Sequence, residues 1–534
     1  MGDDYDAVVV GGGHNGLTAA AYLARAGMRT LVLERREIVG GACVTEEIAP
    51  GVRASSTSYI ASMLRPEVIR DLRLAEYGLR MVPCEPALQV PFLDGEILPW
   101  WSDPERTASE IERLSSVDAR AFVELDGRLK RLARYLQPFF LEPPPDVSAG
   151  GLRRLRELAR IARRLRGIGG REVGELVRLL TGSLRELLDR HFESEHVKTL
   201  VAANNVYGMH GPPSRPGTAL GLLFHLLSGG HEETQGYFGH VIGGMGAITE
   251  AMAAAARGFG AEIRTEAPVV SIEVVGGRAQ GVVLEDGTEI PARVILSNAD
   301  PKRTFLRLVD KRELPEDFLA DVAAIRMDGP SAKVNFVLRE EPRVTAMPAN
   351  ADPGRRALFT LLPSPEFADR CYEAAMRGEI PERLWVDCVV ASNVDATLAP
   401  EGTHVMTCFV QYVPFRLADG SWDERRDLLG DRVLAGIAEY APNVPNAVLA
   451  RRVLTPIDLE RTYALTEGNI FHGDLSIDQL FFMRPVPGWA RYRTPIDRLY
   501  LCGAGAHPGG GVTGAPGHNA AHAVLRDLRR WGPG

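Results

Sequence analysis

The chain has 534 residues, of which 45% are hydrophobic and 24% charged, the composition of a globular protein with a large core. At about 150 residues per compact unit, this length suggests about three units. The formal net charge of −8 argues against nucleic-acid binding, and the lack of a long apolar run or a signal-type leader favours a cytoplasmic protein.

The first segment of the chain has the pattern of a dinucleotide-binding unit. A short apolar strand over Ala7–Val10 leads into a glycine-rich turn and a helix. Bare backbone N–H groups and a helix amino terminus suit a pyrophosphate, and the glycines that expose them are Gly11, Gly13 and Gly16. Glu34 ends the next strand, eighteen residues after Gly16, where a carboxylate accepts hydrogen bonds from ribose hydroxyls. A tight turn without a ligand is the alternative for the glycines alone.

The segment from residue 86 to 234 is predicted to be mainly helical. Within it, residues 152–166 form a helical pattern with leucines and alanines on one face and seven arginines around the other. Such a helix can lie on an anionic membrane, or it can pack its apolar face against its own domain. Further along, Asn204, Asn205 and His210 are candidates for a substrate cavity, with helix termination at the neighbouring glycines as the alternative.

Two later segments return to the cofactor unit. A glycine-rich turn near residue 244 precedes an alanine-rich helix and a small sheet that includes Val269–Val275. At the carboxyl end, a strand enters a glycine-rich bend over 503–517, and a helix follows from about residue 518 to 529. We therefore expect one discontinuous cofactor domain, made of residues 1–85, 235–310 and 481–534, with substrate-domain insertions at 86–234 and 311–480.

Several motifs resemble those of the phytoene desaturase family of FAD-dependent oxidoreductases, within the amine-oxidase-like superfamily. They are G-G-M-G at 243–246, S-N-A-D-P at 297–301, G-N-I-F-H-G at 468–473, and the glycine-rich run at 508–517. The E-R-x-x-x-x-G-G pattern from Glu34 resembles flavoproteins of the wider glutathione-reductase-like superfamily. The chain is most similar to the branch of pyridine nucleotide-disulfide oxidoreductase domain-containing protein 2, and the similarity runs from end to end. It implies an α/β fold: a glutathione-reductase-like (Rossmann-type) FAD-binding domain with an inserted α+β substrate domain.

The resemblance also implies which residues hold FAD. By this resemblance, Gly11, Gly13 and Gly16 hold the pyrophosphate, and Glu34 binds the adenosine ribose with Arg35 beside it. Gly40, Gly41 and Ala42 lie along the path of the cofactor. Val269 matches the position that contacts adenine, although an ordinary buried sheet valine explains it equally well. The resemblance assigns the phosphate or ribityl chain to Gly503 and Ala504 and the isoalloxazine to Val512 and Thr513, and it makes the neighbouring Gly511 a further cofactor-binding residue.

Candidates for proton handling are few. Lys333, near the start of an apolar strand, resembles the amine-oxidase lysine that reaches flavin N5 through water; the alternative is a strand-edge lysine whose ammonium group reaches solvent. His472 and His507 are further candidates, although most histidines in such places bond to the backbone.

The expected function is FAD-dependent dehydrogenation of a hydrophobic small molecule such as a polyene or lipid. The six cysteines show no C-x-x-C spacing, so we expect neither a redox disulfide nor a metal site. The sequence has no second nucleotide-binding motif, so we expect reduced flavin to pass its electrons to dioxygen, a quinone or a protein. A flavin amine oxidase is the first alternative. A redox-neutral isomerase or hydratase and a flavin-stabilised interaction protein are the others.

Overall fold

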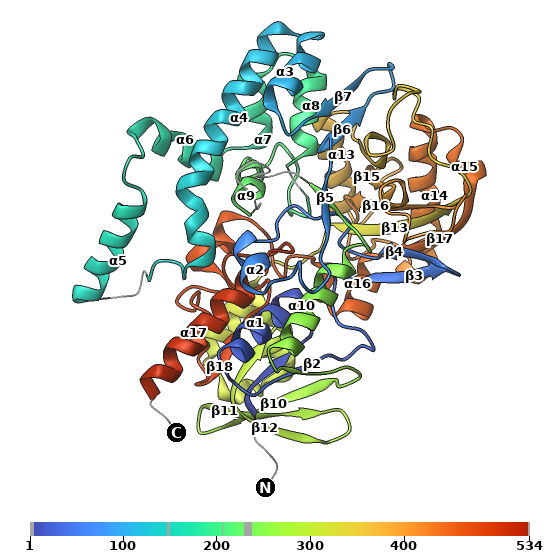
Figure 1. Cartoon of the computed structure of the whole chain (residues 1–534). Helices are drawn as coiled ribbons and strands as arrows, with labels where there is room; N and C mark the ends of the chain where they lie inside the picture. Colours follow the sequence, from blue (N-terminus) through green and yellow to red (C-terminus); the bar gives the residue numbers. More distant parts are fainter. Residues whose placement is uncertain (1–4, 147–149, 206, 229–237, 532–534) are drawn as a thin grey trace.

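The computed structural model describes residues 5–146, 150–205, 207–228 and 238–531. Two larger sheets, three two-stranded sheets and a group of helices make up the described part of the molecule (Figure 1). Both chain ends lie near the larger, seven-stranded sheet, the five-stranded sheet lies at the other end, and most of the helices between residues 104 and 228 gather beside the latter.

The seven-stranded sheet has a parallel part built from segments that are far apart in the sequence. Its order is β9-β2-β1-β12-β18, and the strands are β1 (Tyr5–Val10), β2 (Thr30–Leu33), β9 (Glu262–Arg264), β12 (Glu289–Ser297) and β18 (Leu499–Leu501). An antiparallel extension adds β10 (Val269–Val275) and β11 (Arg278–Leu284). Val8 and Val9 are fully buried, as expected for a central parallel strand that is covered on both faces.

Three helices accompany this sheet: α1 (His14–Arg25), α10 (Gly246–Gly258) and α17 (Ala515–Trp531). Helix α1 packs against both of the others. Its residues Ala20 and Ala21 are fully buried, and their small side chains allow this close packing. The predicted Rossmann-like α/β arrangement is confirmed. The last helix begins three residues earlier than predicted, because Thr513 caps it ahead of residue 518: its hydroxyl accepts a hydrogen bond from Ala515 N.

The five-stranded sheet is antiparallel throughout, in the order β14-β15-β16-β13-β17. Its strands are β13 (Ser331–Leu338), β14 (Leu358–Leu361), β15 (Trp385–Val389), β16 (His404–Gln411) and β17 (Val448–Leu454). Successive side chains of a strand point to opposite faces, so Ala332, Val334 and Phe336 join an apolar core with helix α14 (Trp422–Tyr440). The other face of β13 presents Ser331, Lys333 and Asn335, and all of β13 is buried.

The segment predicted to be mainly helical contains seven α-helices in its described part. They are α3 (Pro104–Glu112), α4 (Ser116–Leu136), α5 (Gly151–Arg164), α6 (Gly170–Thr181), α7 (Leu184–His191), α8 (Glu195–Ala203) and α9 (Leu220–Ser228). The segment also holds a hairpin of β6 (Leu88–Pro91) and β7 (Ile97–Trp100). The expected boundary near residue 234 lies outside the described residues.

The remaining elements are short and connect these parts. The helices are α2 (Pro66–Asp71), α11 (Pro301–Arg303), α12 (Glu316–Ala324), α13 (Pro365–Met376), α15 (Val444–Ala447) and α16 (Pro456–Tyr463). The strands are β3 (Thr45–Ala49), β4 (Val52–Ser55), β5 (Met81–Pro83) and β8 (Gly239–Val241). In the described part of the chain, no helix is both long and apolar enough to cross a membrane.

Two cysteines that are twenty residues apart in the sequence meet in the five-stranded sheet. Cys388 and Cys408 are direct cross-strand partners with their Sγ atoms 3.8 Å apart, on the face that packs against α14. The linear spacing gives no sign of this proximity, because antiparallel pairing alone creates it.

A buried arginine fixes the loop that carries the G-N-I-F-H-G motif. Arg484 is 2% exposed, and its guanidinium group donates to the carbonyl groups of Ala504 (3.0 Å), Asp474 (3.0 Å), Gln479 (3.1 Å), Gly473 (3.3 Å) and Phe471. Only a planar, multiply donating group satisfies so many acceptors at once. Arg484 therefore ties the loop to the glycine-rich carboxyl-terminal bend.

Replacing Arg484 should destabilise the fold far more than replacing an exposed arginine. Arg484→Met leaves several buried carbonyl groups without a donor, each at about 1–3 kcal/mol, so we expect the free energy of unfolding to fall by at least about 3 kcal/mol. Urea denaturation measures the change. Arg377→Met, at an exposed arginine paired with Glu379, is the matched control, and an equal loss in the two variants would contradict the role of Arg484.

Candidate active site

The parallel strands bring four connections to one edge of the seven-stranded sheet. The registers pair Val10 with Leu33 and with Ser297, and Ser297 with Leu501, so β1, β2, β12 and β18 end side by side. The residues just beyond these ends include Gly11, Glu34, Asn298 and Gly503. In open α/β sheets, ligands bind at this edge.

Two adjoining cavities open from this edge. The first, called here the nucleotide groove, has an empty volume of about 1010 Å³ and is lined among others by Gly11, Glu34, Val269 and Ala504. The second, called the inner cavity, has an empty volume of about 950 Å³ and lies between the glycine-rich bend and the five-stranded sheet. His14, Ala42 and Ile470 line both, so the two cavities form one elongated site.

The amino terminus of α1 faces the nucleotide groove without a side-chain cap. Gly13 is the N-cap residue and offers no side chain to bond the first N–H groups of the helix, while Gly13, His14 and Asn15 all line the groove. Gly11 has a φ of +98°, a conformation that glycine adopts without strain, and a Cβ at Gly16 would collide with the carbonyl oxygen of Gly11. This terminus can receive the pyrophosphate of a dinucleotide.

Glu34 is held rigidly at the end of β2. Its carboxylate accepts hydrogen bonds from Gly12 N (2.8 Å) and Arg36 N (2.9 Å), and the side chain is nearly buried. Its backbone is fixed as well, because its N–H donates to Arg264 O and its carbonyl accepts from Ala267 N, both at 2.9 Å. Carboxylate oxygens have further lone pairs, so Glu34 can also accept from ribose hydroxyls in the groove.

The structure distributes the predicted cofactor residues over both cavities. The nucleotide groove is lined by Gly11, Gly13, Glu34, Arg35, Gly40, Gly41, Ala42, Val269 and Ala504. The inner cavity is lined by Ala42, Gly511 and Val512. Gly503 lets its strand approach Asn298, since a Cβ there would lie 2.6 Å from Asn298 O. Thr513 differs from expectation: its side chain is fully buried and its hydroxyl serves α17 instead of facing the inner cavity.

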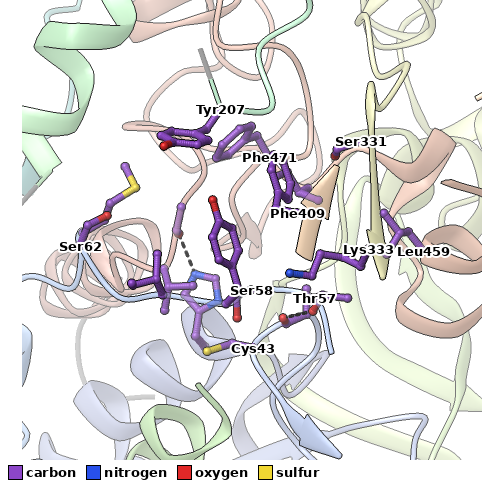
Figure 2. A pocket seen from close by; sticks show the side chains of 18 of the residues that line it. Cys43, Thr57, Ser58, Ser62, Tyr207, Ser331, Lys333, Phe409, Leu459 and Phe471 are labelled. Carbon is purple, nitrogen blue, oxygen red and sulfur yellow. Dashed lines mark hydrogen bonds between the residues drawn. The ribbon is translucent and has the colours of Figure 1, made fainter. Parts of the chain in front are cut away.

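The inner cavity is aromatic and contains one lysine. Figure 2 shows Lys333 extending inward from β13, with Phe409, Phe471 and Tyr207 gathered on one side. The ammonium nitrogen lies 4.3 Å from the centre of the Tyr59 ring, and that ring stacks on Phe409 at a centroid distance of 5.4 Å. Lys333 is 2% exposed and β13 is an inner strand, so the alternative of a strand-edge lysine reaching solvent is wrong.

Lys333 belongs to a row of residues that crosses the whole five-stranded sheet. Cross-strand pairing places Thr360, Asp387, Phe409, Lys333 and Leu454 side by side, one from each strand. Directly paired residues share a face, so Asp387 lies on the same face of the sheet as Lys333, on the other side of Phe409. The Asp387 carboxylate accepts a 2.6 Å hydrogen bond from the Thr360 hydroxyl.

Burial shifts both ionisable groups of this row towards neutrality. It lowers the pKa of Lys333 to about 7 and raises the pKa of Asp387 to about 7, because each charge lacks water. Among the described residues, Lys333 Nζ has no hydrogen-bond partner. A buried lysine of this kind can exchange a proton near neutral pH.

The histidines occupy different places. His472 lines the nucleotide groove, whereas His507 is buried and hydrogen-bonds through Nε2 to the Phe139 carbonyl at 2.9 Å. Burial lowers the pKa of His507 to about 4. Its hydrogen bond to a backbone carbonyl is typical of a structural histidine. His14, which the motif does not identify as a site residue, lies where the two cavities meet and forms a hydrogen bond with Gly511 O at 3.0 Å.

The segment around residue 204 is a helix end. Helix α8 ends at Ala203 with Asn204 as its C-cap, and Asn205 donates to Thr218 O at 3.1 Å. Neither these asparagines nor His210 is among the described residues that line the two cavities. Residue 206, in the same segment, lies outside the described residues.

Besides His14, three groups at the site are not predicted from the sequence as site residues. Asn298 donates to Gly11 O at 3.2 Å and lines the groove, and Tyr59 and Asp387 surround Lys333. Two of them have a signal in the sequence: Asn298 belongs to the S-N-A-D-P motif, and W-V-D-C-V places Asp387 as one acid inside an otherwise apolar strand pattern.

Comparisons with known proteins agree with this geometry. A model for an NAD(P)-binding Rossmann-like domain matches residues 9–71, and one for flavin containing amine oxidoreductases matches residues 119–525. The chain is 41% identical to the mouse pyridine nucleotide-disulfide oxidoreductase domain-containing protein 2, over 98% of this chain and 94% of the mouse protein. It is 27% identical to the neurosporene-forming phytoene desaturase of Rhodobacter capsulatus, over 95% and 91% of the two chains.

Solved structures show the same fold at lower identity. A putrescine oxidase, crystallised as wild type with putrescine, superposes with a TM-score of 0.58 at 17% identity and covers 99% of each chain. With one family model matching most of its length and a 41% identical relative spanning nearly all of it, the chain belongs to the flavin containing amine oxidoreductase family.

Proposed function

We propose that this FAD-dependent oxidoreductase introduces a double bond into a hydrophobic substrate, such as a polyene or lipid, bound in the inner cavity. The single observation that carries the proposal is the lining of that cavity. Aromatic and aliphatic side chains dominate it, and among the described lining residues there is no aspartate or glutamate. Such a lining suits a ligand with apolar surface and few polar groups.

An amine oxidase is the second candidate, because Lys333 and several aromatic rings share the inner cavity. Amines are mostly protonated at neutral pH, and an ammonium substrate would meet in this cavity a lysine that repels it whenever Lys333 is itself protonated, at and below a pH of about 7. No lining carboxylate offsets that repulsion in the described residues. The charge pattern therefore favours a neutral hydrocarbon over an amine.

FAD fits the residues of the elongated site. The uncapped end of α1 suits its pyrophosphate, Glu34 its adenosine ribose, and Gly511 and Val512 lie where the groove continues into the inner cavity. When bound, FAD supplies the acceptor for a hydride from a substrate carbon. We propose dioxygen, a quinone or a protein as the final electron acceptor. We also propose that the unit is glutathione-reductase-like and that the five-stranded sheet and the helices of residues 86–234 form an inserted α+β substrate domain.

Lys333 provides the other half of the dehydrogenation. Forming a C=C bond removes a hydride from one carbon and a proton from its neighbour. The neutral amine of Lys333 Nζ accepts that proton, which its depressed pKa permits at neutral pH. Asp387 acts as a positioning residue, because its nearby carboxylate raises the pKa of Lys333 and partly offsets the effect of burial.

Substrate class is tested by anaerobic mixing of the purified holoprotein with linear polyenes, cyclic terpenes, unsaturated lipids and primary amines. We expect the visible flavin absorbance to bleach with a hydrocarbon or lipid, accompanied by a new double bond in the product. Bleaching by amines alone would overturn the proposal in favour of amine oxidation. Product formation without net bleaching or acceptor consumption would indicate an isomerase or hydratase instead.

The role of Lys333 predicts a pH profile. Dehydrogenation by the wild type should rise with pH through about 7 and then level off, because only the neutral amine accepts a proton. Lys333→Met should lose that inflection and react roughly 10²- to 10⁴-fold more slowly. Stopped-flow flavin reduction across pH measures both effects. An unchanged profile in the variant would exclude Lys333 as the proton acceptor.

Two controls separate chemistry from folding. Folding lowers the lysine pKa from 10.5, so wild-type stability falls as pH drops from 10.5 towards 7, and Lys333→Met should unfold at equal or higher urea concentration at pH 7. Asp387→Asn keeps the shape of the side chain but removes its charge. Its profile should shift to lower pH, which a purely structural role for Asp387 would not produce.

Glu34 should contribute strongly to FAD affinity. Glu34→Ala removes charge-assisted hydrogen bonds worth about 1.5–3 kcal/mol, so the dissociation constant should rise roughly 10- to 150-fold. Equilibrium titration of apoprotein with FAD, followed by flavin fluorescence, measures it. Glu37→Ala, at an exposed acid three residues away, is the control, and equal affinity of the Glu34 variant and the wild type would refute the assignment.

A further inference from the structure

Helix α5 presents an apolar face to solvent. Leu152, Leu155 and Leu158 are 75%, 62% and 53% exposed, and their spacing places them on the same side of the helix as the exposed Ala159 and Ala162. A helix that packs on its own domain buries such a stripe. The alternative in which this helix packs its apolar face against its own domain is therefore wrong. Figure 1 shows α5 standing out from the body of the molecule.

The polar face of α5 holds the helix in this orientation. Glu157 pairs with Arg491 at 3.4 Å and with Arg160 at 2.8 Å, Arg160 donates to Pro143 O at 3.2 Å, and Arg164 pairs with Glu142. Side chains that usually face water are thus turned towards the protein. The leucines lie on the opposite side of the helix and therefore point away from the protein.

The charge around the leucine face is strongly positive. Residues 152–166 contain seven arginines and one glutamate, although the whole chain carries a net charge of −8. On a helical projection, Arg156 and Arg163 lie at the border of the leucine face. In the part of the chain that the structure describes, neither forms an ion pair, so both remain available for an external anion.

We propose that the outward face of α5 docks on an anionic membrane surface. Leu152, Leu155 and Leu158 enter the interfacial region, while Arg156 and Arg163 meet lipid phosphates. A second copy of the chain fits this face poorly, because a twofold contact would set the same arginines against each other. The proposal concerns where the protein resides and does not depend on the chemistry proposed above.

Vesicle co-sedimentation tests the proposal with the full-length holoprotein. Wild type should sediment with vesicles of phosphatidylcholine mixed with phosphatidylglycerol, weakly with phosphatidylcholine alone, and less at high salt. The double variant Arg156→Gln with Arg163→Gln should bind roughly 30-fold more weakly, because each arginine near an anionic membrane contributes about 1 kcal/mol to binding. The triple variant Leu152→Gln, Leu155→Gln, Leu158→Gln should lose binding almost completely.

A matched triple variant controls for a general loss of surface hydrophobicity. Val270→Gln, Val275→Gln and Leu449→Gln change comparably exposed residues elsewhere and should bind vesicles as wild type does. Leu155→Trp gives an independent readout, since its fluorescence should shift to the blue and be quenched by brominated lipid. Three results would overturn the proposal: wild type stays in the supernatant, the leucine triple variant still binds vesicles, or the wild type is a dimer that the leucine substitutions dissociate.

Discussion

Parallel pairing of strands from distant parts of the chain is the constraint on which the site depends. Because β1, β2, β12 and β18 run the same way in register, their ends deliver Gly11, Glu34, Asn298 and the 503–517 bend to one edge. Backbone donors, a carboxylate and an uncapped helix terminus therefore meet at this edge because of the strand pairing, without long-range contacts between side chains. The hydrogen bonds of His14 to Gly511 and of Arg484 to Ala504 hold the last of these segments in place.

The five-stranded sheet carries an apolar core on one face and the buried ionisable groups Lys333 and Asp387 on the other. Its apolar face packs with α14, and this packing compensates for the cost of placing Lys333 and Asp387 on the opposite face without water. The cost appears as pKa values near neutrality for both groups. A lysine so placed is poorly suited as a structural cation but well suited to exchange a proton beside an apolar ligand.

The proposed hydrophobic substrate and the outward leucine face of α5 pose one physical question, namely how an apolar molecule reaches the inner cavity from water. A protein that rests on a lipid surface avoids the aqueous step, because the substrate is already concentrated in the bilayer. In this view the ion pairs of Glu157 and Arg164 matter as much as the leucines, since they decide which face of α5 points outward.

The sequence alone determined the cofactor unit, because its requirements are local: glycines at a turn, an acid at the end of the next strand, and the correct spacing between them. The strands at Thr30–Leu33 and Val269–Val275 were predictable to the residue because their local patterns run apolar or alternate between apolar and polar residues. Tertiary structure decided the rest. Asp387 joins Lys333 only through pairing across three strands, Thr513 turns to cap its helix, and His507 bonds a carbonyl that lies 368 residues away in the chain. The amphipathic pattern of α5 was visible in the sequence, but which face meets water depends on contacts with Glu142 and Arg491, which no local pattern encodes.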